Sequence, residues 1–575
     1  MSNSDRRPYK TSTLLDQEFL NFCQDNLECK LELIVDIETP SGFIRASDRP
    51  KYVISGGAGI FYENRMKFPV ISRTVGEWLS TQIEFSVLKL TLNNADGKFN
   101  DLLPDGLNYD GFIGRSVEVK LGLRDVGSTF TTIFKGTISD VGGFARDISA
   151  INITARDNYD KLDVKFPNTV LSAASFPNIQ DDVVGTLVPV IYGDWTVAGN
   201  PLSSNASVPA FVLNGADPNV NGTISNTNDV ELIISENDLK SLSSSDVWVK
   251  KGDNYFNLSP LDITVGIGNR FVDIAQDTGN STIEGGANYI FEESDEYFVK
   301  CIGKDLAGFD DNIVEQARDI LKTYAGVLVS EFDSNWDTFR SKASPSESSI
   351  ATIRCRIWIQ DPQSVLAFVL SLLEQVRLEA FIDRNLMLKI SSLHLDDFSS
   401  SPSFKVTNFD VVEKSFRPTT PVRNTFNRAQ AVYSFLPDSN ENSKQTSFYR
   451  NNAAVAQMNK VIDKRIVFPN LYIESDVESQ LKEILKISSS GLEHIDCELT
   501  WRALLLDIGD FVSLDVKIGS TIYENVPCLI RDLGYDPQGI KIPVRLWSTQ
   551  LLPFPGYTGV TGSVGGSSAN IVQET

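Results

Sequence analysis

Histidine and paired cysteines, the usual protein ligands of transition metals, are scarce in this 575-residue sequence. It has two histidines, and none of its six cysteines stands in a Cys-x-x-Cys pair, which predicts reduced, partly buried thiols rather than a disulfide framework. His494 and Cys497 lie three residues apart, but the second ligand pair that a structural zinc site needs is missing. His394 follows a predicted strand and is interpreted as an ordinary histidine. We therefore expect no metal site and no cofactor.

Basic clusters and long apolar runs are missing as well. Asp and Glu outnumber Lys and Arg by 75 to 52, which gives a net charge of −23. A protein that grips nucleic acid needs clustered Lys and Arg to displace counterions, so we expect DNA only in transit past an acidic surface. No run approaches 18 apolar residues, and no apolar stretch follows Arg6 and Arg7 as in an export signal. We expect a chain that is made and folded in a cytoplasm and inserts stably into no membrane.

No group of residues stands out as a catalytic site. Gly56–Gly59 lacks the G-x-G-x-x-G spacing and the lysine of a phosphate-binding loop. Asn93–Gly97 carries oxygen ligands but lacks the distal glutamate of a calcium loop, as does the acidic loop Asp438–Glu441, so Asx-type turns are favoured for both. The 75 acidic residues offer many carboxylate pairs for glycoside hydrolysis, yet no spacing selects one. The sequence thus predicts no catalytic, cofactor-binding or metal-binding residue and favours a protein that is not an enzyme.

Alternating strand patterns, in contrast, are abundant. From residue 30 to 168, polar and apolar residues alternate in segments such as Lys30–Glu38, Thr81–Leu92 and Ser116–Leu123. Breaks at Gly, Asn and Asp separate these segments at short intervals, which is typical of antiparallel barrels and sandwiches.

Apolar stripes with helical spacing predict three helices farther along the chain. The first runs from about Asp311 to Ala325 and is capped by Asp310 or Asp311, and the second opens at Asp361 and Pro362. The third covers about Ser475–Ile487. These helices lie between predicted strands, so the fold class is mainly β with α+β domains.

The patterns divide the chain into seven parts. They are an N-terminal helix or arm (1–29), a β-rich domain (30–168), a connecting segment (169–200), an inserted small β domain (201–300), an α/β domain (301–400), a β-rich domain with one helix (401–552) and a flexible tail rich in Gly, Ser and Thr (553–575). The helix of the arm, residues 12–28, either docks on a neighbouring subunit or packs on its own domain. The sequence therefore predicts a multidomain protein.

Four stretches resemble the motifs of one protein family. They are Ile83–Phe99, which ends in NNADGKF, Val188–Gly193 (VPVIYG), Asn312–Val327 (NIVEQARDILKTYAGV), and Asn424–Tyr433 followed by Asp507–Leu514 (DIGDFVSL). In this order they resemble the tail hub or tail-tip proteins of long-tailed bacteriophages and gene-transfer particles. The resemblance implies barrel-like hub domains similar to those of the phage baseplate hub, and it leaves the 201–300 segment without a counterpart.

The resemblance also implies a function. Hubs of this kind form a homotrimer around a channel, so three copies would close the tail tube at the tip of the virion and open for genome ejection. Their partners would be the distal tail protein, the tape-measure protein, and tail fibre or receptor-binding proteins. Two alternatives stay open. The first is a tail protein for host attachment that binds a receptor or glycan through exposed aromatic side chains of the inserted domain, such as Trp248 and Tyr255. The second is a tail-associated cell-wall hydrolase.

Overall fold

The computed structural model describes residues 31–573 apart from a set of short internal stretches. These are 56–57, 75–85, 104–110, 124–129, 143–148, 158–161, 177–178, 180–182, 197–207, 214–229, 253, 275–280, 283–287, 290–294, 343–349, 385, 394–401, 420–424, 438–439, 491–492, 505, 519–520, 536–540 and 549–570. The predicted helix of residues 12–28 and His394 lie outside the described residues, as do parts of the Gly56–Gly59 and Asp438–Glu441 loops. The fold is mainly β and multidomain, as the sequence predicts.

The first β unit is a curved sheet with the strand order β5-β6-β9-β8-β7-β1-β2-β4-β3. Its strands are β1 (Leu31–Thr39), β2 (Gly42–Ser47), β3 (Lys51–Ser55), β4 (Ala58–Asn64), β5 (Met66–Thr74), β6 (Val87–Asn93), β7 (Ser116–Leu123), β8 (Phe130–Gly142) and β9 (Ala150–Arg156). The alternating sequence explains these strands. In β6, for example, Leu88, Leu90 and Leu92 are buried, and the residues between them are not.

The second β unit comes from two separate segments near the end of the chain. Its strands are β25 (Phe404–Thr407), β26 (Arg417–Thr419), β31 (Glu493–Thr500), β32 (Phe511–Ile518), β33 (Thr521–Tyr535) and β34 (Lys541–Ser548). β33 pairs antiparallel with β5, from Asp532↔Thr74 to Tyr535↔Ile71, so both units belong to one 15-stranded sheet and share one apolar core. We call the β5–β33 pairing the seam.

The inserted domain is a seven-stranded antiparallel sheet with its own core. Its strands are β12 (Val208–Val212), β13 (Val230–Ile233), β14 (Ser241–Lys251), β15 (Asn254–Asn257), β16 (Ile263–Val265), β17 (Phe271–Ile274) and β20 (Glu296–Ile302), beside a short pair formed by β18 (Ser281–Thr282) and β19 (Asn288–Tyr289). In β14, Val247 and Val249 point into the core, whereas Trp248 lies on the opposite face.

A central α/β unit connects the inserted domain to the seam. It contains β10 (Lys165–Phe166), β11 (Val190–Tyr192), α2 (Ile313–Tyr324), α3 (Asn335–Arg340), β21 (Ile357–Ile359), β22 (Gln363–Ser364), α4 (Val365–Glu374) and the hairpin of β23 (Leu378–Ile382) and β24 (Leu388–Ser392). The helices predicted here are present, but their predicted caps are wrong. The side chain of Asn312, not Asp310 or Asp311, caps α2, and Ser364 caps α4.

A further five-stranded sheet, which we call the fourth sheet, is formed mainly by residues that lie in the sequence between the two segments of the second β unit. It contains β27 (Arg428–Leu436), β28 (Glu441–Gln445), β29 (Tyr449–Asn451), β30 (Asp463–Phe468) and β35 (Ile571–Gln573), with α5 (Asn452–Met458) and α6 (Glu474–Ser490) against it. The described part of the range 401–552 therefore contains two α-helices and contributes to two sheets. β35 belongs to the tail predicted to be flexible from residue 553, yet it pairs with β29.

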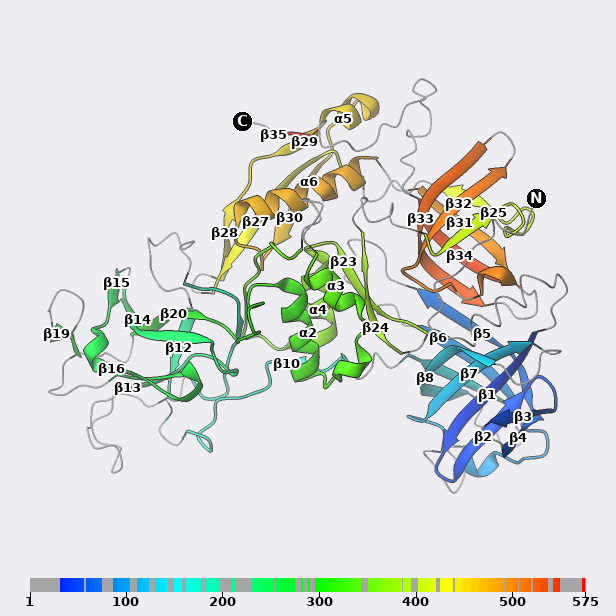
Figure 1. The fold of residues 1–575 in the computed structure, drawn as a ribbon. Coiled ribbons are helices and arrows are strands. Elements are labelled where there is room, and N and C mark those ends of the chain that lie inside the picture. The colour runs from blue at the N-terminus through cyan, green and yellow to red at the C-terminus, as the bar shows by residue number, and fades with distance from the viewer. Residues whose placement is uncertain are drawn as a thin grey trace.

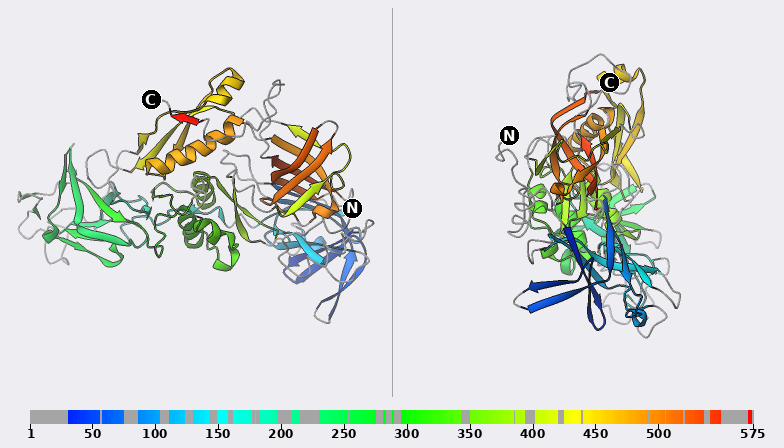
Figure 2. Two further views of the ribbon diagram at one scale, coloured as in Figure 1. Left: turned by 45° about the horizontal axis from the view of Figure 1, so that its top comes forward. Right: turned by 90° about the vertical axis from the view of Figure 1, so that its right-hand side faces the viewer.

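The units form an elongated molecule (Figure 1). The inserted domain stands at one end, the central α/β unit in the middle, and the two β units at the other end. Figure 2 shows the same order from another side, with the N-terminal strands reaching out from the body. None of the described helices has the length and apolarity needed to cross a bilayer.

Candidate functional site: buried arginines at the domain junctions

The first candidate site lies where both β units meet the β23–β24 hairpin. Arg73 of β5 is 3% exposed, and its guanidinium forms an ion pair with the carboxylate of Asp507. Nη2 of Arg73 also donates to the carbonyl oxygen of Ile382 at 2.6 Å. The other oxygen of Asp507 accepts from the backbone N–H of Arg384 at 2.9 Å. One buried arginine therefore ties together the first β unit, the second β unit and the central hairpin.

The charges at this junction shift the two carboxyls of the DIGD motif in opposite directions. Burial alone would raise the pKa of Asp507, but the charge and hydrogen bonds of Arg73 hold it below its usual value. Burial beside the Asp507 carboxylate raises the pKa of Asp510 to about 6. Lys389 of β24 lies 3.3 Å from Asp383 in the same cluster. The cluster is therefore a buried ionic network in which each charge depends on its neighbours.

A second buried arginine strengthens the same junction. Arg531 of β33 is 2% exposed, forms an ion pair with Glu379 of β23, and lies 4.1 Å from the centre of the Trp547 ring. Because β23 belongs to the central unit and β33 to the second β unit, this pair crosses the same boundary as Arg73. Gly509 lies there too, with a φ of +78°. A Cβ atom on it would lie 2.3 Å from Cζ of Phe381, so the DIGD loop packs directly on the hairpin.

A third buried arginine lies where the inserted domain joins the central α/β unit, a junction that we call the root of the inserted domain. Arg356, next to β21, is 3% exposed, and its guanidinium carbon lies 4.3 Å from the centre of the Trp195 ring and 4.9 Å from that of Tyr472. Its Nη2 donates to Oγ of Ser434 at 3.1 Å. Burial lowers the pKa of Arg356 to about 10. The residue following β11, Gly193, packs so closely here that a Cβ atom would lie 2.4 Å from the carbonyl oxygen of Cys355.

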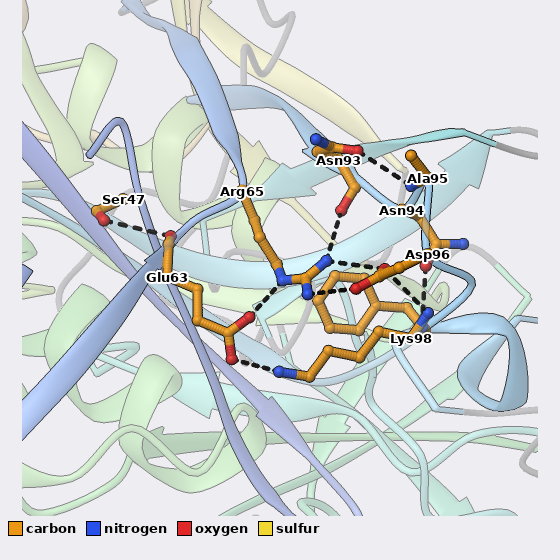
Figure 3. Close-up of polar contacts among 9 residues, drawn as sticks. Ser47, Glu63, Arg65, Asn93, Asn94, Ala95, Asp96 and Lys98 are labelled. Carbon is orange, nitrogen blue, oxygen red and sulfur yellow. Dashed lines mark hydrogen bonds and ion pairs between the residues drawn. The ribbon is translucent and has the colours of Figure 1, made fainter. Parts of the chain in front are cut away.

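The turn Asn93–Gly97 is an Asx-type turn, as the sequence predicts. Oδ1 of Asn93 accepts from the backbone N–H of Ala95 at 3.0 Å, and Oδ1 of Asp96 accepts from that of Lys98 at 3.3 Å. Arg65 donates to both carboxylate oxygens of Asp96, at 2.9 and 2.5 Å (Figure 3). These hydrogen bonds lower the pKa of Asp96 to about 2. A guanidinium thus holds the Asp96 carboxylate through a bidentate ion pair.

The histidine and cysteine of the HIDC motif point to opposite faces of β31. Cys497 belongs to the apolar core, whereas His494 stacks on Trp547 of β34 with ring centroids 5.1 Å apart and an interplanar angle of 9°. The two side chains therefore do not form one site. Among the residues that the structure describes, no three His, Cys, Asp or Glu side chains come together as a possible metal site.

His494 gives rise to a testable pH dependence. Burial and the nearby charge of Arg545 lower its pKa from 6.5 to about 4. Below pH 6.5 the unfolded chain takes up a proton that the folded chain takes up only near pH 4, so stability should fall by up to about 3 kcal/mol over this interval.

Replacing His494 with phenylalanine should remove this loss and keep the stacking on Trp547. Urea unfolding of both proteins at pH 7 and pH 5 measures the difference between them, which cancels the contribution of the carboxyl groups. An equal loss of stability in both proteins would contradict the assignment to His494.

Trp248 and Tyr255 lie on the outward face of the inserted sheet. Both side chains are half-buried. Nζ of Lys300 lies 5.3 Å from the centre of the Trp248 ring, and Tyr255 packs on Phe298 with ring centroids 5.5 Å apart. Nζ of Lys250 lies 6.0 Å from the centre of the Tyr255 ring, so each of the two aromatics on this face has a lysine beside it.

A groove of about 710 Å³ runs along the seam. Val70 of β5 and residues of β26, β31, β33 and β34 line it. Two of its acidic residues, Asp496 and Asp532, form ion pairs with Arg545, at 2.8 and 2.9 Å. Ion pairs across three neighbouring strands make this wall a cross-strand charge ladder.

No protein-family model matches the sequence, and no curated protein matches it. Several solved structures align with most of this chain at low sequence identity, and three of them are tail proteins. A tail protein from Neisseria meningitidis has 9% identity and a TM-score of 0.42, and the alignment covers 91% of this chain and 98% of that one. The 43 kDa tail protein of a Shewanella oneidensis prophage has 11% identity and a TM-score of 0.40, with 90% and 98% covered. A Listeria monocytogenes prophage tail protein has 8% identity and a TM-score of 0.36, with 90% and 95% covered. With TM-scores below 0.5, these likenesses bear on neither the activity nor the partners of this chain.

Proposed function

We propose that this chain is a structural protein of a phage tail tip, which acts as a hub in a ring of three copies and catalyses no reaction. The observation that carries the proposal is the seam with its buried arginines. They join the two β units and the central unit into one body. A protein that connects several partners at fixed angles needs such junctions, because a flexible linker would let its domains move independently.

The proposed hub closes the tail tube and links the distal tail ring and the tape-measure protein to fibre or receptor-binding proteins. Its net charge of −23 suits a channel through which DNA passes without adhering. The inserted domain, at the far end of the molecule from the β units (Figure 1), is placed for outward contacts. Opening for genome ejection would be a change between two packings of the ring, biased by a receptor signal.

The strand edge at the other end of the molecule supports the proposed ring formation. β3 is the last strand of the 15-stranded sheet. Tyr52 on β3 is 69% exposed and packs on Phe61 of β4, which is 44% exposed, with ring centroids 4.8 Å apart. A strand edge beside two exposed aromatic side chains favours pairing with another copy.

Replacing both Tyr52 and Phe61 with lysine should weaken this association without unfolding the chain. We expect a loss of affinity of roughly 30-fold or more, because removing a central aromatic side chain from an interface typically costs about 2 kcal/mol. The control is Leu261→Lys, since Leu261 is 95% exposed on the inserted domain. Analytical ultracentrifugation measures the association. Equal association constants for both variants would contradict a role for the aromatic pair.

Two measurements test the hub proposal: the mass of the assembled protein and the position of the chain in the particle. Sedimentation of the full chain should reveal a species of three times 63.6 kDa, and cryo-electron microscopy of intact particles should place the chain at the distal end of the tail. A chain that stays monomeric even beside its tail neighbours, or that lies elsewhere in the particle, would overturn the proposal.

A further inference from the structure

Strand β29 forms a rigid acceptor for one more strand. One edge of β29 pairs with β27 and the other with β35. Asn451, the last residue of β29, caps α5 and donates to Oγ of Ser489 on α6 at 2.7 Å. Tyr449 at the other end is 3% exposed. The acceptor is therefore fixed by two helices and by the sheet, whichever strand occupies its second edge.

The strand that occupies this edge is short, and its side chains are only partly buried. β35 has three residues, Ile571–Gln573, paired as Tyr449↔Gln573, Arg450↔Val572 and Asn451↔Ile571. Ile571 packs partly buried against the core, and Val572 is 43% exposed. Three residues form only a few backbone hydrogen bonds, and ordering them opposes this gain. The occupancy of the edge thus depends on the local concentration of the strand.

The donor strand and its acceptor belong to different parts of the molecule. β34 ends at Ser548 in the second β unit, and 22 residues, 549–570, separate it from β35 on the fourth sheet. A chain of this length can span at most about 75 Å, so the connection alone does not restrict β35 to the acceptor of its own copy. The same three residue pairs would form on an adjacent copy, because the acceptor is identical in every copy.

We infer that β35 is an exchangeable strand that docks on β29 of a neighbouring copy in the ring. This inference rests on the proposed ring. In a closed ring each copy donates one strand and accepts one, so that no β29 edge is left open. The exchange adds a backbone-paired contact between copies that is independent of the Tyr52–Phe61 surface.

Disulfide trapping tests this exchange. Arg450 and Val572 are directly opposed in the register, a spacing that suits a cross-strand disulfide. Full-length chains carrying Arg450→Cys are mixed with differently tagged full-length chains carrying Val572→Cys and oxidised. Exchange between copies yields a covalent pair that contains both tags. If only the double variant, Arg450→Cys with Val572→Cys, becomes linked, and only within one chain, the inference is overturned.

The matched control replaces Arg450→Cys with Gln445→Cys. Gln445 is exposed on β28 in the same sheet but pairs with Val432, away from β35. If Gln445→Cys forms a disulfide with Val572→Cys in the same yield as Arg450→Cys does, the linkage results from random collision and the inference is overturned. This experiment can reject the strand exchange without rejecting the hub proposal, and the reverse also holds. A trimeric mass without cross-copy linkage removes only the exchange, whereas linkage without a tail-tip location removes only the hub.

Discussion

Replacing Arg73 with alanine should destabilise the protein by about 3–5 kcal/mol, because it leaves the buried Asp507 carboxylate without its counter-charge. The carbonyl oxygen of Ile382 also loses its donor. The first change on unfolding should be the separation of the β units from the central hairpin. Urea titration followed by tryptophan fluorescence measures the loss, and limited proteolysis detects the separation.

The control for Arg73 is an ion pair of the same sheet that lies in solvent. Lys541 and Glu498 are 2.9 Å apart across β31 and β34, and more than a third of each side chain is exposed. Lys541→Ala should therefore cost about 0–1 kcal/mol. The double variant Arg73→Ala with Asp507→Ala should recover part of the loss, since it leaves no uncompensated charge. Equal effects of Arg73→Ala and Lys541→Ala would show that the buried pair does not hold the junction.

Replacing Gly193 with alanine should destabilise the root of the inserted domain by about 2–6 kcal/mol. The φ of Gly193 is +79°, a conformation that side chains disfavour. In addition, the new Cβ atom would lie 2.4 Å from the carbonyl oxygen of Cys355 and 2.8 Å from Cα of Arg356. Both contacts are with backbone, which cannot move aside as a flexible side chain would. The thermal unfolding midpoint and protease cleavage around the inserted domain measure the effect.

The variant Gly185→Ala distinguishes the effect of backbone strain from the effect of the steric clash. Its φ is +89°, and no atom lies within 4 Å of the position that a Cβ atom would take. Gly185→Ala should therefore cost only the backbone strain, about 1–2 kcal/mol. If Gly193→Ala is no worse than Gly185→Ala, then close packing does not secure the root of the inserted domain.

Local patterns allowed the strands and helices to be predicted, but tertiary contacts decided their details. The third predicted helix, Ser475–Ile487, is α6, because its stripe of apolar residues is visible in the sequence itself. The cap of α2 was not predictable in the same way. Oδ1 of Asp310 accepts from the backbone N–H of Leu306, and Oδ1 of Asp311 from that of Asp194. With both aspartates engaged, Asn312 is left to cap the helix.

The buried arginines were missed, although one signal was present. Arg73 follows Ile71 by two residues in a strand, so it shares the inward face with that buried isoleucine. An arginine in an inward position indicates a buried ion pair, but the sequence does not name the partner. Asp507 lies more than four hundred residues away, and the pairing of β5 with β33 that brings it close has no local signature.

The seam also sets the order in which a nascent chain can fold. β5 leaves the ribosome early, whereas β33 is among the last strands to be made. At usual rates of synthesis, roughly 25–90 s pass between them. During this delay β33 and Asp507, the partners of the β5 edge and of Arg73, have not yet been made. The core shared by both β units therefore forms only when translation is nearly complete. The junction that fixes the two β units and the central unit relative to one another therefore forms only after β33 has been made, and a chain that stops before β33 lacks it.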